Sequence, residues 1–158
     1  MAECLVVGIS DQKVARKPDK LVSYALGSCV GICLYDKVLQ VAGLAHILLP
    51  DSKNNVSGSI NVYKYADTAI ERLVQHMEAL GCQRSRIVAK ISGGANMFNT
   101  PGISVGDKNV EAVRRELARL RIKIVAEDVG GNYGRTLMFD SENGMLEVRS
   151  LSHGNKII

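Results

Sequence analysis

The strongest constraint on the fold comes from two segments in which apolar residues repeat every three or four positions. Residues 64–80 carry one apolar stripe, and residues 107–120 repeat the pattern. This spacing predicts two amphipathic helices, because positions three and four apart lie on one face of a helix. Gly81 is expected just after the first helix, and Asp107 is a candidate N-terminal cap of the second. Each helix is therefore expected to cover a sheet with its apolar face.

Short segments rich in β-branched residues predict the strands of that sheet. They are residues 4–10, 21–24, 30–35, 41–48, 87–91, 122–127, 135–139 and 145–151. Residues 36–39 and 140–144 have the composition of hairpin connections. Hairpins combined with two helices predict an α+β fold, a layered sandwich with mostly antiparallel strands and two main helices. A chain of 158 residues is expected to form a single domain over residues 1–158.

The composition restricts the class of protein. Hydrophobic residues make up 46% of the chain, yet no run approaches the roughly 18 apolar residues of a membrane span, so no membrane insertion is expected. Four cysteines without an export signal predict free thiols in a cytoplasmic protein. The net charge of +4 gathers near residues 114–123, where acidic residues are interleaved. With two Phe and no Trp for base stacking, this pattern favours a solvated helix face over nucleic-acid binding.

Three loops are dense in small residues, at positions 26–29, 92–98 and 127–132. Paired glycines permit positive φ angles and close approach of the backbone. The loops are expected either to converge on a pocket or to be separate tight turns. None of them matches a phosphate-binding loop or a dinucleotide fingerprint, so nucleotide binding is not predicted.

Cys29 and His46 form the best candidate for chemistry. Cys29 follows a Gly-Ser turn and begins one predicted strand, and His46 lies in the next. The hairpin at 36–39 would bring both side chains near the same edge of the strand pair. A thiol and an imidazole within hydrogen-bond reach form an ion pair, and the thiolate is a nucleophile. The alternative is a buried, inert cysteine beside a core histidine.

Other candidates have weaker support from the sequence. Cys33 is expected to share the face of Cys29 and to serve in packing. A zinc site of Cys29, Cys33 and His46 lacks a CxxC pair and a fourth ligand. His76 and His153 are expected at the surface.

Several runs, in this order, resemble the signature of the CheD family of chemoreceptor glutamine deamidases. They are LGSCVGICLYD (26–36), GLAHILLPD (43–51), YADTA (65–69), SGGANMF (92–98), GDKNVEAV (106–113) and AEDVGGNYGR (126–135). The resemblance covers nearly the whole chain, and the ordered combination is specific although no single run is. It therefore implies one CheD-like cysteine hydrolase domain.

The resemblance also implies roles for individual residues. Cys29 matches the family nucleophile and His46 its general base. Ser23 matches a third catalytic position, usually a threonine that orients the histidine. Serine keeps the hydroxyl acceptor but lacks the methyl group. The backbone N–H groups of the turn containing Gly27 and Ser28 are candidates for stabilising an oxyanion. The implied activity is conversion of glutamine side chains to glutamate through a thioester, with a methyl ester as a second possible substrate and no cofactor.

The implied partners are methyl-accepting chemotaxis receptors, as substrate, and a CheC-type phosphatase. Phe98 is a candidate anchor for such contacts, with burial under the following helix as the alternative. Two rival functions remain open. One is a non-enzymatic chemotaxis regulator that binds receptors and the phosphatase, and the other is a cysteine peptidase.

Overall fold

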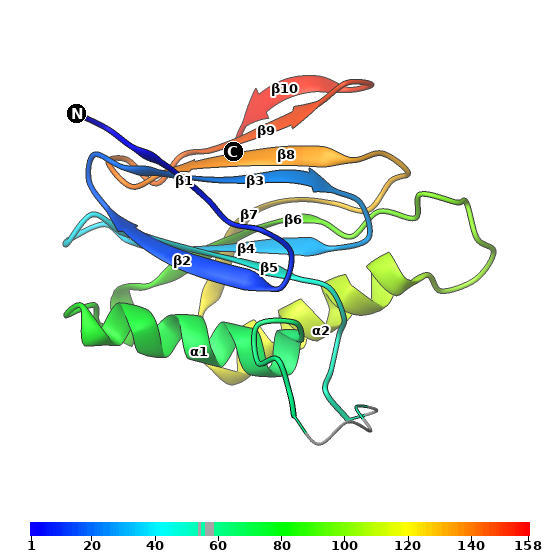
Figure 1. Ribbon diagram of the computed structural model, residues 1–158, viewed down its shortest axis with the longest axis horizontal. Coiled ribbons are helices and arrows are strands. Elements are labelled where there is room, and N and C mark those ends of the chain that lie inside the picture. Colours follow the sequence, from blue (N-terminus) through cyan, green and yellow to red (C-terminus); the bar gives the residue numbers. More distant parts are fainter. Residues whose placement is uncertain (54, 56–58) are drawn as a thin grey trace.

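Within residues 1–53, 55 and 59–158, which the structure describes, the computed structural model forms ten strands and two α-helices. The strands make two five-stranded sheets that lie one above the other, and both helices lie beneath the second sheet (Figure 1). The molecule therefore has three layers, in the order sheet, sheet, helices.

The two sheets have different strand orders. The first runs β1 (Cys4–Val6), β3 (Lys20–Leu26), β8 (Arg135–Asp140), β9 (Leu146–Ser150) and β10 (Gly154–Ile157). The second runs β2 (Asp11–Arg16), β5 (Val41–Ile47), β4 (Val30–Asp36), β6 (Val88–Gly93) and β7 (Lys123–Val129). Among these elements only the pairs β1–β3 and β6–β7 are parallel. The predicted α+β layered sandwich with mostly antiparallel strands and two main helices is confirmed.

The middle strands of the second sheet are buried on both faces. Every residue of β4 and β5 is buried, because one face meets the helices and the other meets the first sheet. Side chains alternate along a strand, so Ile32 and Leu34 join the core under the helices while Cys33 and Tyr35 join the core between the sheets. These two cores hold the layers together and fix which side chains of β4 and β5 face the first sheet.

The helices are amphipathic as predicted, and the structure shows where each one begins and ends. Helix α1 (Ala66–Ala79) is followed by Gly81 at a φ of +98°, and the N–H of Gly81 donates to the carbonyl of Glu78. The predicted glycine at this helix end is therefore confirmed. Helix α2 (Val105–Arg119) begins earlier than expected, with Ser104 as its N-cap. The expectation for Asp107 was wrong in detail, because its carboxylate instead accepts from the Ser104 N–H in a capping box.

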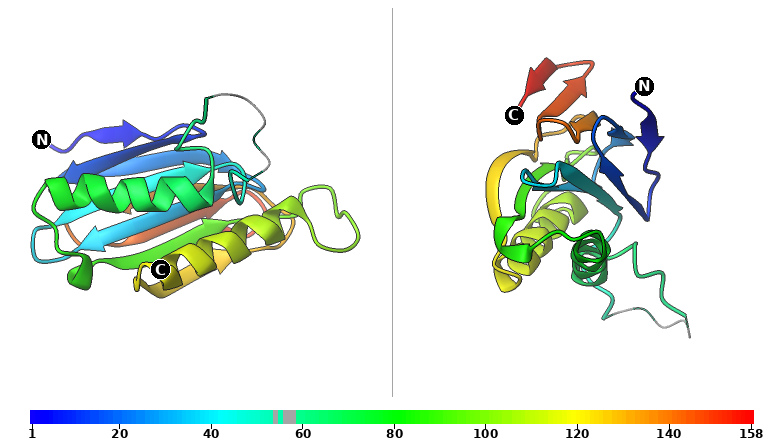
Figure 2. Two further views of the ribbon diagram at one scale, coloured as in Figure 1. Left: turned by 90° about the horizontal axis from the view of Figure 1, so that it is seen from below. Right: turned by 90° about the vertical axis from the view of Figure 1, so that its left-hand side faces the viewer.

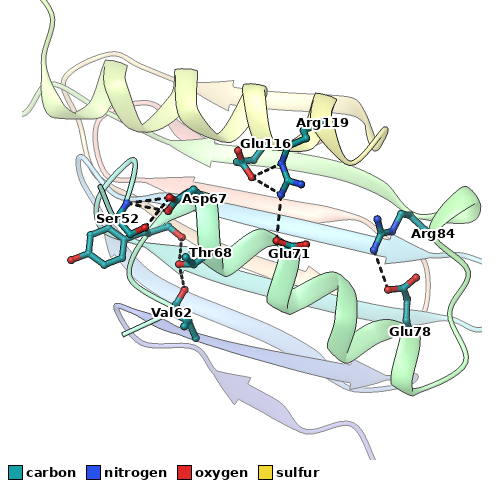
Figure 3. A network of polar contacts seen from close by, with 10 residues as sticks. Ser52, Val62, Asp67, Thr68, Glu71, Glu78, Arg84, Glu116 and Arg119 are labelled. Atoms are coloured by element: carbon teal, nitrogen blue, oxygen red, sulfur yellow. Dashed lines mark hydrogen bonds and ion pairs between the residues drawn. The ribbon is translucent and has the colours of Figure 1, made fainter. Parts of the chain in front are cut away.

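The two helices run across one face of the second sheet (Figure 2). The Arg119 guanidinium of α2 donates to Glu116 of its own helix and to Glu71 of α1, which links the helices at their outer side (Figure 3). Arg114 pairs with Glu127 and Arg115 lies near Glu111. Acidic partners thus offset much of the positive charge that the sequence concentrates near α2.

Two edge strands were not predicted. The segment predicted as one strand at 4–10 ends as β1 at Val6, and the chain then crosses to the second sheet as β2. Among the described strands β2 pairs with β5 alone, and this edge position is compatible with its polar composition. Strand β10 is exposed along its length, and among the described strands it pairs with β9 alone. A short 3₁₀ turn, η1 (Arg84–Arg86), precedes β6.

Among the described residues, no helix has the length and apolarity needed to cross a membrane.

Candidate active site

The β4–β5 hairpin places Cys29 and His46 on one face. Gly31 is the register partner of His46, and Cys29 lies two positions before Gly31. Side chains two positions apart on a strand point the same way, so Cys29 is a diagonal neighbour of His46. Both face the first sheet, and their exposed fractions are 7% for Cys29 and 1% for His46. The two residues that the sequence brought forward therefore come together at one end of the strand pair.

Ser23 of β3 reaches this pair from the opposite sheet. Its Oγ lies 2.7 Å from His46 Nδ1 and 2.7 Å from the carbonyl oxygen of Val7. A carbonyl only accepts, so the Ser23 hydroxyl proton must go to Val7 and His46 Nδ1 must donate to Ser23 Oγ. This arrangement places the ring proton on Nδ1 and leaves the lone pair on Nε2, the tautomer that a general base needs.

His46 Nε2 is the atom available for proton transfer. It is buried, and no described residue hydrogen-bonds to it, Cys29 included. Burial lowers the pKa of His46 to about 4, although the Val7 carbonyl and Asp11 act in the opposite direction. Burial also raises the pKa of the Cys29 thiol, offset in part by the backbone N–H of Cys29 itself.

These shifts favour the neutral thiol and the neutral imidazole in the free protein. A low-dielectric site disfavours both charges, so these shifts oppose the thiolate–imidazolium ion pair that the sequence led us to expect. A direct hydrogen bond between catalytic groups often forms only when substrate is bound.

The three glycine-rich loops converge, which is one of the two arrangements that the sequence left open. The Gly94 N–H donates to the Cys29 carbonyl at 2.8 Å, and the Asn96 N–H donates to the Gly131 carbonyl at 2.9 Å. Gly93 shows why a glycine is required here. Its φ is +111°, and a Cβ atom on it would lie 2.2 Å from the Cys29 carbonyl oxygen. The second loop can pack on the cysteine turn only because this position has no side chain.

The turn before the cysteine is held by hydrogen bonds to its carbonyl groups. The Gly27 carbonyl accepts from the Ala95 N–H at 2.9 Å, and the Ser28 carbonyl accepts from Asn109 Nδ2 at 2.9 Å. In a trans peptide the C=O and the following N–H point in opposite directions. The N–H groups of Ser28 and Cys29 are thus directed away from the elements that hold the turn.

Asn109 is a site residue for which the sequence analysis assigned no role. It lies on the buried side of α2 and also donates to the Leu48 carbonyl at 3.0 Å. The available signal was a polar amide on the apolar face of a predicted helix, close to Val110 and Val113. An amide in such a position needs hydrogen-bond partners.

The remaining candidates lie away from this chemistry. Cys33 is fully buried in the core between the sheets, where burial raises the pKa of its thiol. His153 is exposed in the turn between β9 and β10 and stacks on Tyr133. His76 is only half-buried, near Tyr63.

Phe98 is exposed and does not lie under α2. Its exposed fraction is 91%, so the alternative of burial is wrong. Other apolar side chains around it are also exposed, namely Met97, Ile103 and Val105. A hollow of about 260 Å³ runs between this group and Ser28. The exposed apolar group thus borders the turn that carries Cys29.

Comparison with known proteins gives a consistent picture. Residues 48–150 match the family described as CheD chemotactic sensory transduction. The chain is 47% identical to the probable chemoreceptor glutamine deamidase CheD of Syntrophomonas wolfei and 44% identical to the chemoreceptor glutamine deamidase CheD of Halalkalibacterium halodurans, with all of each chain covered in both cases. It is 45% identical to the chemoreceptor glutamine deamidase CheD of Bacillus licheniformis, covering 94% of this chain and 90% of that protein.

A solved structure aligns more distantly. The crystal structure of the Bacillus licheniformis hypothetical protein YfiH matches with a TM-score of 0.47 and 16% identity, over 75% of this chain and 49% of that chain.

Proposed function

Because this chain belongs to the CheD family, we propose that it is a chemoreceptor glutamine deamidase that uses Cys29 as nucleophile and His46 as general base. The reaction hydrolyses a glutamine side-chain amide to glutamate and ammonia. The observation that carries the proposal is the Ser23–His46 hydrogen bond, which leaves the His46 Nε2 lone pair free on the face that Cys29 shares.

The first half of the reaction transfers an acyl group to the enzyme. His46 Nε2 removes the thiol proton of Cys29 as Sγ attacks the substrate amide carbon, and a C–S bond forms. The backbone N–H groups of Ser28 and Cys29 donate to the oxygen that becomes negative, and each such donor contributes on the order of 3 kcal/mol. His46 then gives its proton to the departing nitrogen, the C–N bond breaks, and ammonia leaves.

The second half regenerates the thiol. His46 removes a proton from water as the water oxygen attacks the thioester carbon, the C–S bond breaks, and His46 returns the proton to the departing Cys29 sulfur. The products are a glutamate side chain and the Cys29 thiol. Ser23 keeps the ring in one orientation through both halves. The steps require no metal ion or organic cofactor, and a glutamyl methyl ester is a second possible substrate.

The neutral resting state is compatible with this mechanism. Because burial disfavours both charges, the thiolate and imidazolium form together during attack, when the charge passes to the substrate oxygen. Proton transfer and attack are therefore coupled, and Cys29 stays protected from unproductive reactions between substrates.

The exposed apolar group around Phe98 is the proposed docking surface for partners. It borders the Cys29 turn, so a helical receptor segment seated there would present a side chain to the site. We assign the second partner, a CheC-type phosphatase, to the same surface. The two partners then compete for one surface.

One observation favours the rival function of a non-enzymatic regulator. The Cys29 thiol has a raised pKa and no hydrogen bond to His46 in the free protein. A regulator would bind receptor and phosphatase through Phe98 without using the thiol.

Mass spectrometry of a chemoreceptor cytoplasmic fragment incubated with the protein separates the two. We expect a Gln-to-Glu mass increase with the wild type, and none with Cys29→Ala or His46→Ala. Cys33→Ala is the matched control, because Cys33 lies on β4, just after Cys29, and faces the same core, but takes no part in the steps above. Unmodified receptor with the wild type, together with retained binding, would support the regulator. Modification that persists in Cys29→Ala would exclude the thioester mechanism.

A further inference from the structure

We propose that Asn109 is a positioning residue of the active site, whose carboxamide clamps the ends of β4 and β5 and orients the peptide group between Ser28 and Cys29. The inference deepens the proposed function and rests on it. Asn109 comes from α2, has an exposed fraction of 0%, and donates to Ser28 and Leu48 carbonyls at 2.9 and 3.0 Å.

The clamp lies where the strand ladder stops. The last register pair of β4 and β5 is Val30 with Ile47, so Ser28 and Leu48 lie beyond it. The Leu48 N–H donates to the carbonyl of Lys64, so it is not available to pair with the segment before β4. The two N–H bonds of the Asn109 amide replace the missing ladder contacts and tie the segment before Cys29 to the segment after His46.

The same contact sets the direction of one N–H group. A peptide unit is planar and trans, so fixing the Ser28 carbonyl toward α2 turns the Cys29 N–H the opposite way. That N–H belongs to the same residue as the thiol, and it acts to lower the pKa of the thiol. It is also one of the two donors assigned above to the oxyanion. Asn109 thereby acts on the reacting atoms through the backbone and does not touch them.

Packing alone does not explain an asparagine at this position. Its Oδ1 is buried and has no hydrogen-bond partner among the described residues. A buried acceptor left without a partner destabilises the fold. An apolar side chain would avoid that cost, but it would supply neither of the two donors. The cost of the unpaired Oδ1 is explained if the active site needs the two N–H donors of Asn109.

The test compares Asn109→Ala, Asn109→Ser and Asn109→Asp with Ser104→Ala in the full chain. Ser104→Ala removes the N-cap of α2 and destabilises the same helix without touching the clamp. For the Asn109 variants we expect kcat to fall about 10- to 100-fold, with KM changed by less than about threefold. We also expect alkylation of Cys29 by iodoacetamide to shift to higher pH. Ser104→Ala should change neither readout.

Each outcome has a defined meaning. Alkylation reports on the clamp even if receptor fragments are not modified, so a failure of the proposed function is visible as inactive wild type with an intact alkylation shift. Asn109 variants that match Ser104→Ala in kcat and in alkylation would overturn the positioning role. Failure of all three Asn109 variants to fold, with Ser104→Ala folded, would also overturn it, because Asn109 would then be a folding residue.

Discussion

Burial of His46 makes the stability of the protein depend on pH in a defined window. The folded chain holds the pKa of His46 at about 4, against 6.5 for an unburied histidine. The unfolded chain therefore binds a proton more readily, and stability that is present above pH 6.5 is lost as the pH falls toward 4. At pH 5 the expected loss, relative to pH 7, is about 2 kcal/mol.

Urea unfolding at pH 7 and pH 5 measures this loss. His46→Gln is the comparison, because glutamine does not titrate and should remove about 2 kcal/mol of the pH dependence. The lowered pKa values of carboxyl groups such as Asp36, Glu127 and Glu147 act at lower pH and remain in both proteins. Equal pH dependence in the two proteins would refute the reasoning, since His46 would then have the same pKa in the folded and the unfolded chain.

Three further changes test the site. Ser23→Ala should lower kcat roughly 10- to 100-fold because His46 loses its orienting partner. Ser23→Thr keeps the hydroxyl group and should stay active. Steady-state kinetics of receptor deamidation measures kcat for both variants. Gly93→Ala should destabilise the fold by about 3 kcal/mol or more, because a Cβ would collide with the Cys29 carbonyl. Gly130→Ala, at a φ of +83° with open space around a Cβ, should cost only about 1 kcal/mol. Thermal melts that gave equal losses for the two variants would contradict the close approach of Gly93 to Cys29. Phe98→Asp should leave the melting temperature unchanged but abolish binding to receptor fragments. Val38→Asp, at an exposed position on the β4–β5 turn, should bind them normally. Scanning calorimetry measures the melting temperature, and titration calorimetry measures the binding.

Local sequence patterns were enough to predict the architecture. The apolar stripes of the two helices and the β-branched strands fix an α+β layered fold, because the periodicity shows which faces must be buried. The hairpin between Asp36 and Val41 also fixes which strand ends meet, and with them the pairing of Cys29 and His46. Edge strands such as β2 and β10 escaped this reasoning because they bury little and carry polar side chains.

The sequence by itself therefore determined the layered α+β class and the family to which the chain belongs, and it identified Cys29 and His46 as the candidate pair. Only the tertiary structure decided which ring nitrogen of His46 is free, because the answer depends on Ser23 and Val7 from other strands. It alone showed that burial disfavours the charged forms of the pair and that Asn109 reaches the Cys29 turn from α2. Protonation and orientation depend on contacts between segments far apart in the chain, and such contacts leave no periodic signal in a single sequence.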